Sequence, residues 1–156
     1  MKKIILLLFI GCTFSSYGQG FNDDKTAFSN FLKRMYNSSP FEGVKIVDDY
    51  DHQYLVSVIS LEKAKYTSES VMNRVAQVKA QSQASTFLNG ATISMDMIIT
   101  TKETQDSTNN VTTIVETVEE IKQNSVGFSQ GLELITNIND SDGLKMVFIY
   151  MRAIKE

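Results

Sequence analysis

The chain has 156 residues, of which 42% are hydrophobic, 21% charged and 10% aromatic, and its formal net charge is −3. This composition predicts one domain of ordinary size and excludes a disordered chain, a collagen-like chain and a small disulfide-stapled protein. An acidic chain without a basic tract also lacks the positive patch of a nucleic-acid-binding protein, so no nucleic acid partner is expected.

The first 18 residues have the order of a signal peptide. Lys2-Lys3 forms a basic start, and residues 4–10 form an apolar run that is too short to cross a bilayer, which takes about 20 residues. Ser16 and Gly18 are the small residues, two apart, that precede a cleavage site. We expect cleavage after Gly18 and export to the periplasm or to the outer membrane.

A lipid anchor at Cys12 is the alternative outcome. The segment Phe9-Ile10-Gly11-Cys12 resembles an acylation signal, although Phe9 stands where such signals prefer an aliphatic residue. Membrane association is expected only if Cys12 is lipidated, because two acyl chains anchor a protein stably. Cys12 is the sole cysteine, so a mature chain of residues 19–156 has no disulfide, catalytic thiol or thiolate metal ligand. Its charge is −5, because the removed segment carries two lysines and no acid.

Residues 19–40 are predicted to form a short N-terminal helical segment ahead of a core at residues 41–156. Asn22 is a good helix N-cap, and Pro40 ends the helical pattern. Apolar residues at helical spacing form one stripe on this helix: Phe28, Phe31, Leu32 and Met35. Such a stripe either packs on the rest of the domain or binds a partner. We expect it to bind an envelope protein, whose identity the sequence does not give.

The core begins with two predicted strands and a long helix. Residues 44–48 and 53–61 have strand patterns, and the second is apolar on both faces, which predicts a central position in the sheet. A helix is expected from Ser68 to about Asn89, with Gly90 after its end. Its small residues at four-residue spacing form a ridge that lets a helix lie close to a sheet: Ala76, Ala80 and Ala84.

The rest of the core is predicted to be mainly strands. Residues 91–101 alternate as a strand, residues 102–110 form a polar loop, and residues 111–121 fit a strand or a helix, with a returning strand preferred. Residues 132–138 and 144–154 form a hairpin around a two-residue turn at Asp142-Gly143. The predicted fold is therefore α+β: an antiparallel sheet of about five to six strands with one long helix packed on it.

Residues 54–154 resemble a known family. The alanine helix ends at Leu88-Asn89-Gly90, the β segment 92–95 follows, and Asp142-Gly143 leads into residues 147–152. This arrangement resembles the LPP-twenty lipoprotein family of bacterial envelopes, which includes the N-terminal domain of the flagellar assembly protein FlgT. The resemblance implies a small envelope domain with a structural or assembly role and no catalytic residues. A second resemblance is to the periplasmic fold of SIMPL-type proteins, which are also non-enzymatic.

Residues that could carry chemistry are few. Asp48, Asp49, Asp51 and His52 could form a weak cation site, but a solvated turn is the favoured interpretation, because no glycine-bearing loop or distal glutamate completes a cage. His52 is the sole histidine, and no nucleophile elbow is present. We therefore predict no enzyme activity, catalytic residue, metal or cofactor. The expected role is assembly or interaction through protein–protein contacts, and the alternative is a periplasmic domain that binds a small ligand or a cation.

Overall fold

The computed structural model describes residues 23–49, 52–90, 97–100, 118 and 125–155. The elements in chain order are α1 (Asp23–Ser38), β1 (Gly43–Asp49), β2 (His52–Glu62), the 3-10 turn η1 (Lys63–Lys65), α2 (Glu69–Gly90), β3 (Ile98–Thr100), α4 (Ser125–Gln130), β4 (Glu133–Asn139) and β5 (Lys145–Lys155).

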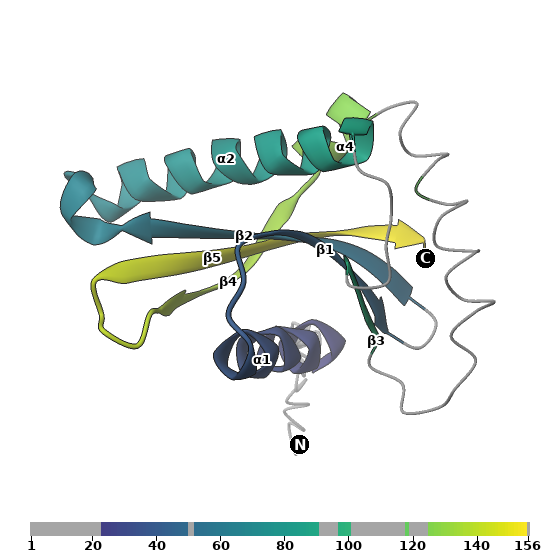
Figure 1. Cartoon of the computed structure of the whole chain (residues 1–156), viewed down its shortest axis with the longest axis horizontal. Helices are drawn as coiled ribbons and strands as arrows, with labels where there is room; N and C mark the ends of the chain where they lie inside the picture. The colour runs from purple at the N-terminus through teal and green to yellow at the C-terminus, as the bar shows by residue number, and fades with distance from the viewer. Residues whose placement is uncertain (1–22, 50–51, 91–96, 101–117, 119–124, 156) are drawn as a thin grey trace, which may run out of the picture.

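The described strands form a five-stranded sheet between two helical layers. Its strand order is β3-β1-β2-β5-β4, so β2 has the central position that its two apolar faces predict. Helix α2 lies along one face of the sheet and α1 lies on the other (Figure 1). The predicted α+β fold is confirmed.

One pairing differs from the expected antiparallel order. β1 pairs with β2, β2 with β5 and β5 with β4 in antiparallel fashion, but β3 pairs with β1 in parallel, so the sheet is mixed. Short turns force neighbouring strands to run antiparallel. β3 instead follows a long helix, after which the chain can enter the sheet in either direction.

Two hydrophobic cores lie on opposite faces of the sheet. Side chains alternate along β2, so Leu55 and Ile59 face α2 whereas Val56 and Val58 face α1. β5 divides its side chains in the same way. The alanine ridge of α2 is fully buried against the sheet, as predicted: Ala76, Ala80 and Ala84.

The start of the long helix follows the predicted signal, but its end does not. The Ser68 hydroxyl accepts a hydrogen bond from the Val71 N–H at 3.3 Å, which satisfies one of the free donors of the first turn. The helix then runs from Glu69 to Gly90. Gly90, predicted to follow the helix, is therefore part of it and does not have a positive φ.

The β4–β5 connection is longer than predicted. The Asp140 N–H donates to the Lys145 carbonyl at 3.1 Å, and the Gly143 N–H donates to the Asp140 carbonyl at 2.9 Å. Four residues therefore lie between the last paired residues, instead of two. Gly143 has a positive φ of 70°, which glycine adopts without steric cost.

Other predictions fall on segments that the structure does not describe. These are the strand start at residues 91–96, the polar loop at residues 102–110 and most of residues 111–121. Of the last segment only Val118 is described; it has helical rather than strand backbone and is fully buried. Helix α4 was not predicted, because six residues that include Gly127 are too few to show a hydrophobic period.

Candidate functional site

The apolar stripe of α1 packs inside the molecule. Phe28 and Leu32 are buried at 6% and 0% exposure, and the Phe28 ring lies 4.5 Å from the Tyr54 ring, centroid to centroid. Phe31 and Met35 are partly buried against the same core. In this conformation the stripe holds α1 on the sheet, and Phe28 and Leu32 present no surface to a partner.

The predicted cation cluster is divided between two paired strands, in which Asp49 lies opposite His52. Asp48 and Asp49 belong to β1 and His52 to β2, so they lie in the hairpin strands and not in its turn; Asp51 is outside the described residues. Asp48 is buried whereas His52 is exposed. In the described part of the chain, no three His, Cys, Asp or Glu side chains are grouped as metal ligands. Cys12 also lies outside the described residues.

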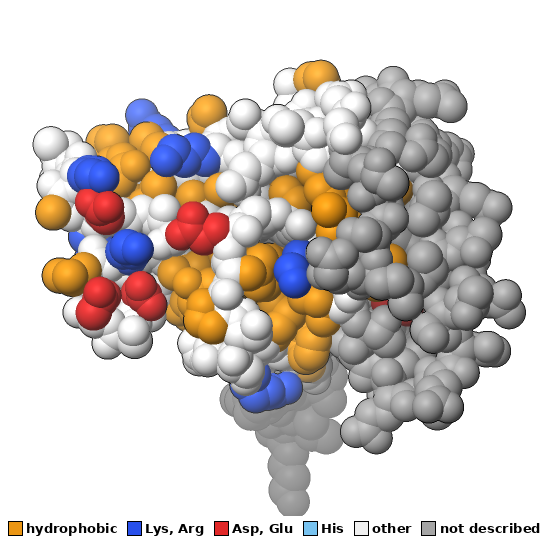
Figure 2. Space-filling view, viewed as in Figure 1, with side chains coloured by type: hydrophobic (Ala, Val, Ile, Leu, Met, Phe, Trp, Pro, Cys, Tyr) orange, Lys and Arg blue, Asp and Glu red, His pale blue; other side chains and the backbone are white. Residues whose placement is uncertain are grey.

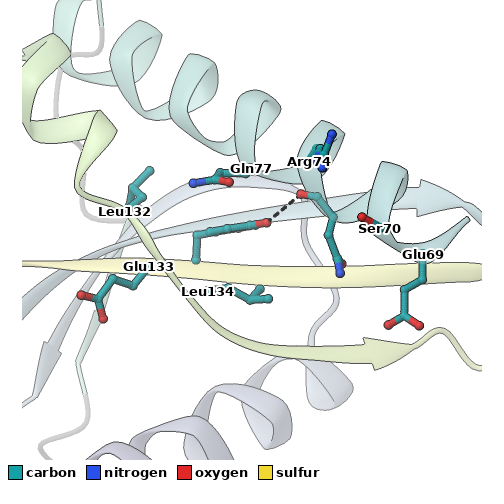
Figure 3. Close-up of a pocket in the computed structure, with 9 residues that line it drawn as sticks. Glu69, Ser70, Arg74, Gln77, Leu132, Glu133 and Leu134 are labelled. Carbon is teal, nitrogen blue, oxygen red and sulfur yellow. Dashed lines mark hydrogen bonds between the residues drawn. The ribbon is translucent and has the colours of Figure 1, made fainter.

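A hollow of about 710 Å³ lies between α2 and the start of β4. Figure 3 shows the side chains of α2 above it and those of β4 below it. The lining residues are Glu69, Ser70, Asn73, Arg74, Gln77, Leu132, Glu133, Leu134 and Tyr150. We call this hollow the α2–β4 groove.

The floor of the α2–β4 groove is apolar with one hydroxyl. Leu132 and Tyr150 are buried, whereas Leu134 is 41% exposed. The Tyr150 hydroxyl donates to the Asn73 carbonyl at 3.3 Å. Burial raises the pKa of Tyr150 to about 12, so the hydroxyl keeps its proton and stays a donor near neutral pH.

The helix wall of the groove carries unmatched polar groups. The Asn73 Oδ1 atom is buried and has no hydrogen-bond partner among the described residues, a cost that native structures usually avoid. Within the same part of the chain, Arg74 has no acidic partner. On the strand side, the Glu133 carboxylate points away from α2 (Figure 3) and pairs with the Lys25 ammonium at 2.9 Å. Arg74 is therefore the one cation that lines the described groove, and the Glu69 carboxylate, five residues earlier on α2, also has no ion-pair partner among the described residues.

Large apolar side chains are exposed at five of the described positions, and one of these lies in the α2–β4 groove. Figure 2 shows hydrophobic side chains between the two helical layers and charged side chains gathered at the end where α2 begins. The large apolar residues that are exposed in the described ranges are Val71, Val78, Val126, Leu134 and Leu144. Of these, only Leu134 lines the α2–β4 groove.

A second hollow, of about 670 Å³, lies beside the end of β5 and has a structural arginine at its rim. The Arg152 Nη1 atom donates to the carbonyls of Gly127 and Phe128 at 2.9 Å and 2.5 Å. Its guanidinium also lies 4.5 Å from the Phe128 ring centroid. Arg152 thus connects α4 to the sheet through its Nη1 atom.

The sequence identifies none of the residues of the α2–β4 groove as a site. Spacing places Asn73, Arg74 and Gln77 on one side of a helix, but it does not show which strand faces them. No described helix has the length and hydropathy needed to cross a bilayer. Comparison of the chain with models of protein families, with curated proteins and with solved structures gives no match.

Proposed function

We propose that this chain is an exported, non-enzymatic envelope protein that binds another protein through the α2–β4 groove. The observation that carries the proposal is the exposed Leu134 side chain, which lies on the outer strand of the described sheet and on the floor of an open groove. The signal-peptide pattern of residues 1–18 and the resemblance to an envelope family support the location.

The shape of the groove favours a polypeptide over a small molecule. Its helix wall runs from Glu69 to Gln77, which is about 12 Å at the rise of an α-helix. That length accommodates roughly four residues of extended chain. Small-molecule sites usually enclose most of the ligand, whereas this groove opens to solvent beside β4.

The chemistry of the lining also suits a polypeptide. Leu132, Leu134 and the Tyr150 ring offer apolar contact, and the amides of Asn73 and Gln77 offer both donors and acceptors. A peptide presents the same mixture of apolar side chains and amide groups.

Selection from phage-displayed random decapeptides tests this proposal. Wild-type protein should enrich binding peptides, and Leu134→Lys should lose them, because an ammonium group would occupy the apolar floor. Leu144→Lys is the matched control, since Leu144 is 68% exposed at the β4–β5 connection and does not line the groove. Thermal unfolding first establishes that both variants fold.

Two results would overturn the proposal. One is that wild-type protein enriches no peptide above an empty support. The other is that Leu134→Lys enriches the same peptides as wild type.

A further inference from the structure

We infer that the segment bound in the α2–β4 groove is an extended strand that pairs with the outer edge of β4 and places an acidic side chain beside Arg74. This inference rests on the proposed function and specifies the occupant of the same site. It combines a strand edge that is free in the described sheet, a groove beside it and the one cation that lines that groove.

The hydrogen-bond phase of β4 shows which backbone groups are free. The Asp140 N–H donates to the Lys145 carbonyl, so the backbone of Asp140 faces β5. Backbone direction alternates along an antiparallel strand, and Asn139 pairs with Met146 while Asn137 pairs with Phe148. The N–H and C=O groups of Asn137 and Asn139 therefore point away from β5, where the described sheet has no further strand.

The composition of β4 leaves this edge open to pairing. Edge strands are commonly protected by lysine, by proline or by bulges. β4 (Glu133–Asn139) contains neither lysine nor proline. It has one irregularity, between Leu134 and Thr136, which confines regular pairing to the part of the strand that follows. An added strand would pair with Asn137–Asn139 and continue over Leu134 into the groove.

The charge in the groove specifies one side chain of the added strand. Every second side chain of that strand would face α2, as Leu134 does. Arg74 is the one cation that lines this side, and it has no acidic partner in the described part of the chain. Of the two lining carboxylates, Glu133 is paired with Lys25, and Glu69 lies five residues before Arg74 at the start of α2. A carboxylate on the added strand can accept both N–H groups of the guanidinium fork. The recognised segment is thus extended, apolar at one position facing α2 and acidic at the next.

Peptide backbone methylation tests the strand pairing. The probe is a blocked octapeptide of alternating threonine and valine, in which one valine is replaced with glutamate. Two versions of the peptide are compared, one N-methylated at the odd positions and one at the even positions, so that each version lacks one of the two alternating sets of N–H donors. Methylation of one set should weaken binding at least about tenfold, and methylation of the other set should have little effect, because only one set of N–H groups faces β4.

A proline variant tests the same pairing from the protein side. Asn137→Pro removes an N–H that points away from β5, so it leaves the β4–β5 hydrogen bonds intact. It should weaken the binding of the octapeptide about as much as methylation of the peptide does. If the variant does not fold, the methylated peptides still decide the question.

A charge exchange tests the acidic position. Arg74→Glu should lower the affinity for the glutamate peptide at least about tenfold. The same variant should bind a peptide with lysine in place of the glutamate more tightly than wild type does. Lys79→Glu is the matched control: it makes the same change of charge on α2 at an exposed residue outside the groove, and should leave both affinities nearly unchanged.

The outcomes separate this inference from the proposed function. Equal effects of the two methylation phases, or equal effects of Arg74→Glu and Lys79→Glu, would overturn the strand or the acidic position. If one of these is overturned but the binding of displayed peptides still depends on Leu134, the groove remains a binding site. A failure of all displayed peptides to bind would overturn both.

Discussion

Gly131 is required by the position of Arg152. A Cβ atom at residue 131 would overlap the Arg152 guanidinium, so Gly131→Ala should move this side chain and weaken its hydrogen bonds to the carbonyls at the end of α4. We expect a loss of about 1–2 kcal/mol in the free energy of unfolding, measured by urea denaturation. Gly90→Ala is the control, because a Cβ there meets nothing within 4 Å.

A double-mutant cycle identifies the cause of this loss. In an Arg152→Ala background, Gly131→Ala should cost almost nothing, because the side chain that it displaces is gone. An equal cost in both backgrounds would show that the backbone of Gly131, and not the arginine, sets the requirement.

Tyr150 should make stability fall at high pH. Its pKa is raised from 10.0 to about 12 by burial, so between these values the unfolded chain releases the proton while the folded chain keeps it. The resulting stabilisation of the protonated fold is complete below pH 10 and is lost as the pH rises toward 12. Tyr150→Phe removes this dependence together with one hydrogen bond, worth about 0.5–1.5 kcal/mol.

Urea unfolding of both proteins across the alkaline range measures the effect. The advantage of wild type over Tyr150→Phe should be constant near neutral pH and should shrink above pH 10. A constant advantage up to pH 12 would mean that Tyr150 titrates with its ordinary pKa.

Helix α2 lies close to the sheet because its buried ridge is made of alanine. The Ser57 hydroxyl donates to the Ala80 carbonyl at 3.4 Å, so strand and helix backbones are near one another at this point. Ala80→Arg should cost at least about 1–3 kcal/mol, since the site has no room and no partner for a guanidinium. Ser82→Arg, on the exposed face of the same helix, should change stability by less than about 0.5 kcal/mol. Equal melting temperatures for the two variants would contradict this packing.

The sequence predicts elements well where one local signal decides them. Ser68 marks the start of α2, and the two apolar faces of β2 mark it as central. The sequence does not predict the parallel entry of β3, because a long helix separates that strand from its neighbours.

The α2–β4 groove could not be predicted from the sequence for a similar reason. Arg74 and Leu134 line the same groove only because of the order of the strands in the sheet. The stripe of α1 was recognised correctly as apolar, but periodicity alone does not say whether such a stripe faces a sheet or a partner.

Processing sets the covalent state of the whole molecule. Cleavage after Gly18 should yield a chain that begins at Gln19, and the intact mass of the exported protein measures this directly. A mass that includes diacylglyceryl at Cys12 would replace this prediction with a membrane-anchored form.

The two cores should unfold as one unit, because β2 and β5 contribute side chains to both of them. Leu32→Ala removes a fully buried side chain from the α1 side and should cost about 2–5 kcal/mol. If unfolding is cooperative, amide hydrogen exchange should accelerate by the same factor in α1 and in α2, although α2 lies across the sheet from the substitution. Leu144→Ala, at an exposed position, should leave both rates unchanged.

The opposite result would alter the view of how this protein binds. Fast exchange confined to α1 in the wild-type chain, with α2 still protected, would show that α1 leaves the sheet on its own. Its stripe of Phe28, Phe31, Leu32 and Met35 would then reach solvent and become available to a partner, as the sequence alone predicts. Hydrogen exchange therefore decides whether the α2–β4 groove is the main binding surface or whether a detached α1 offers a second one.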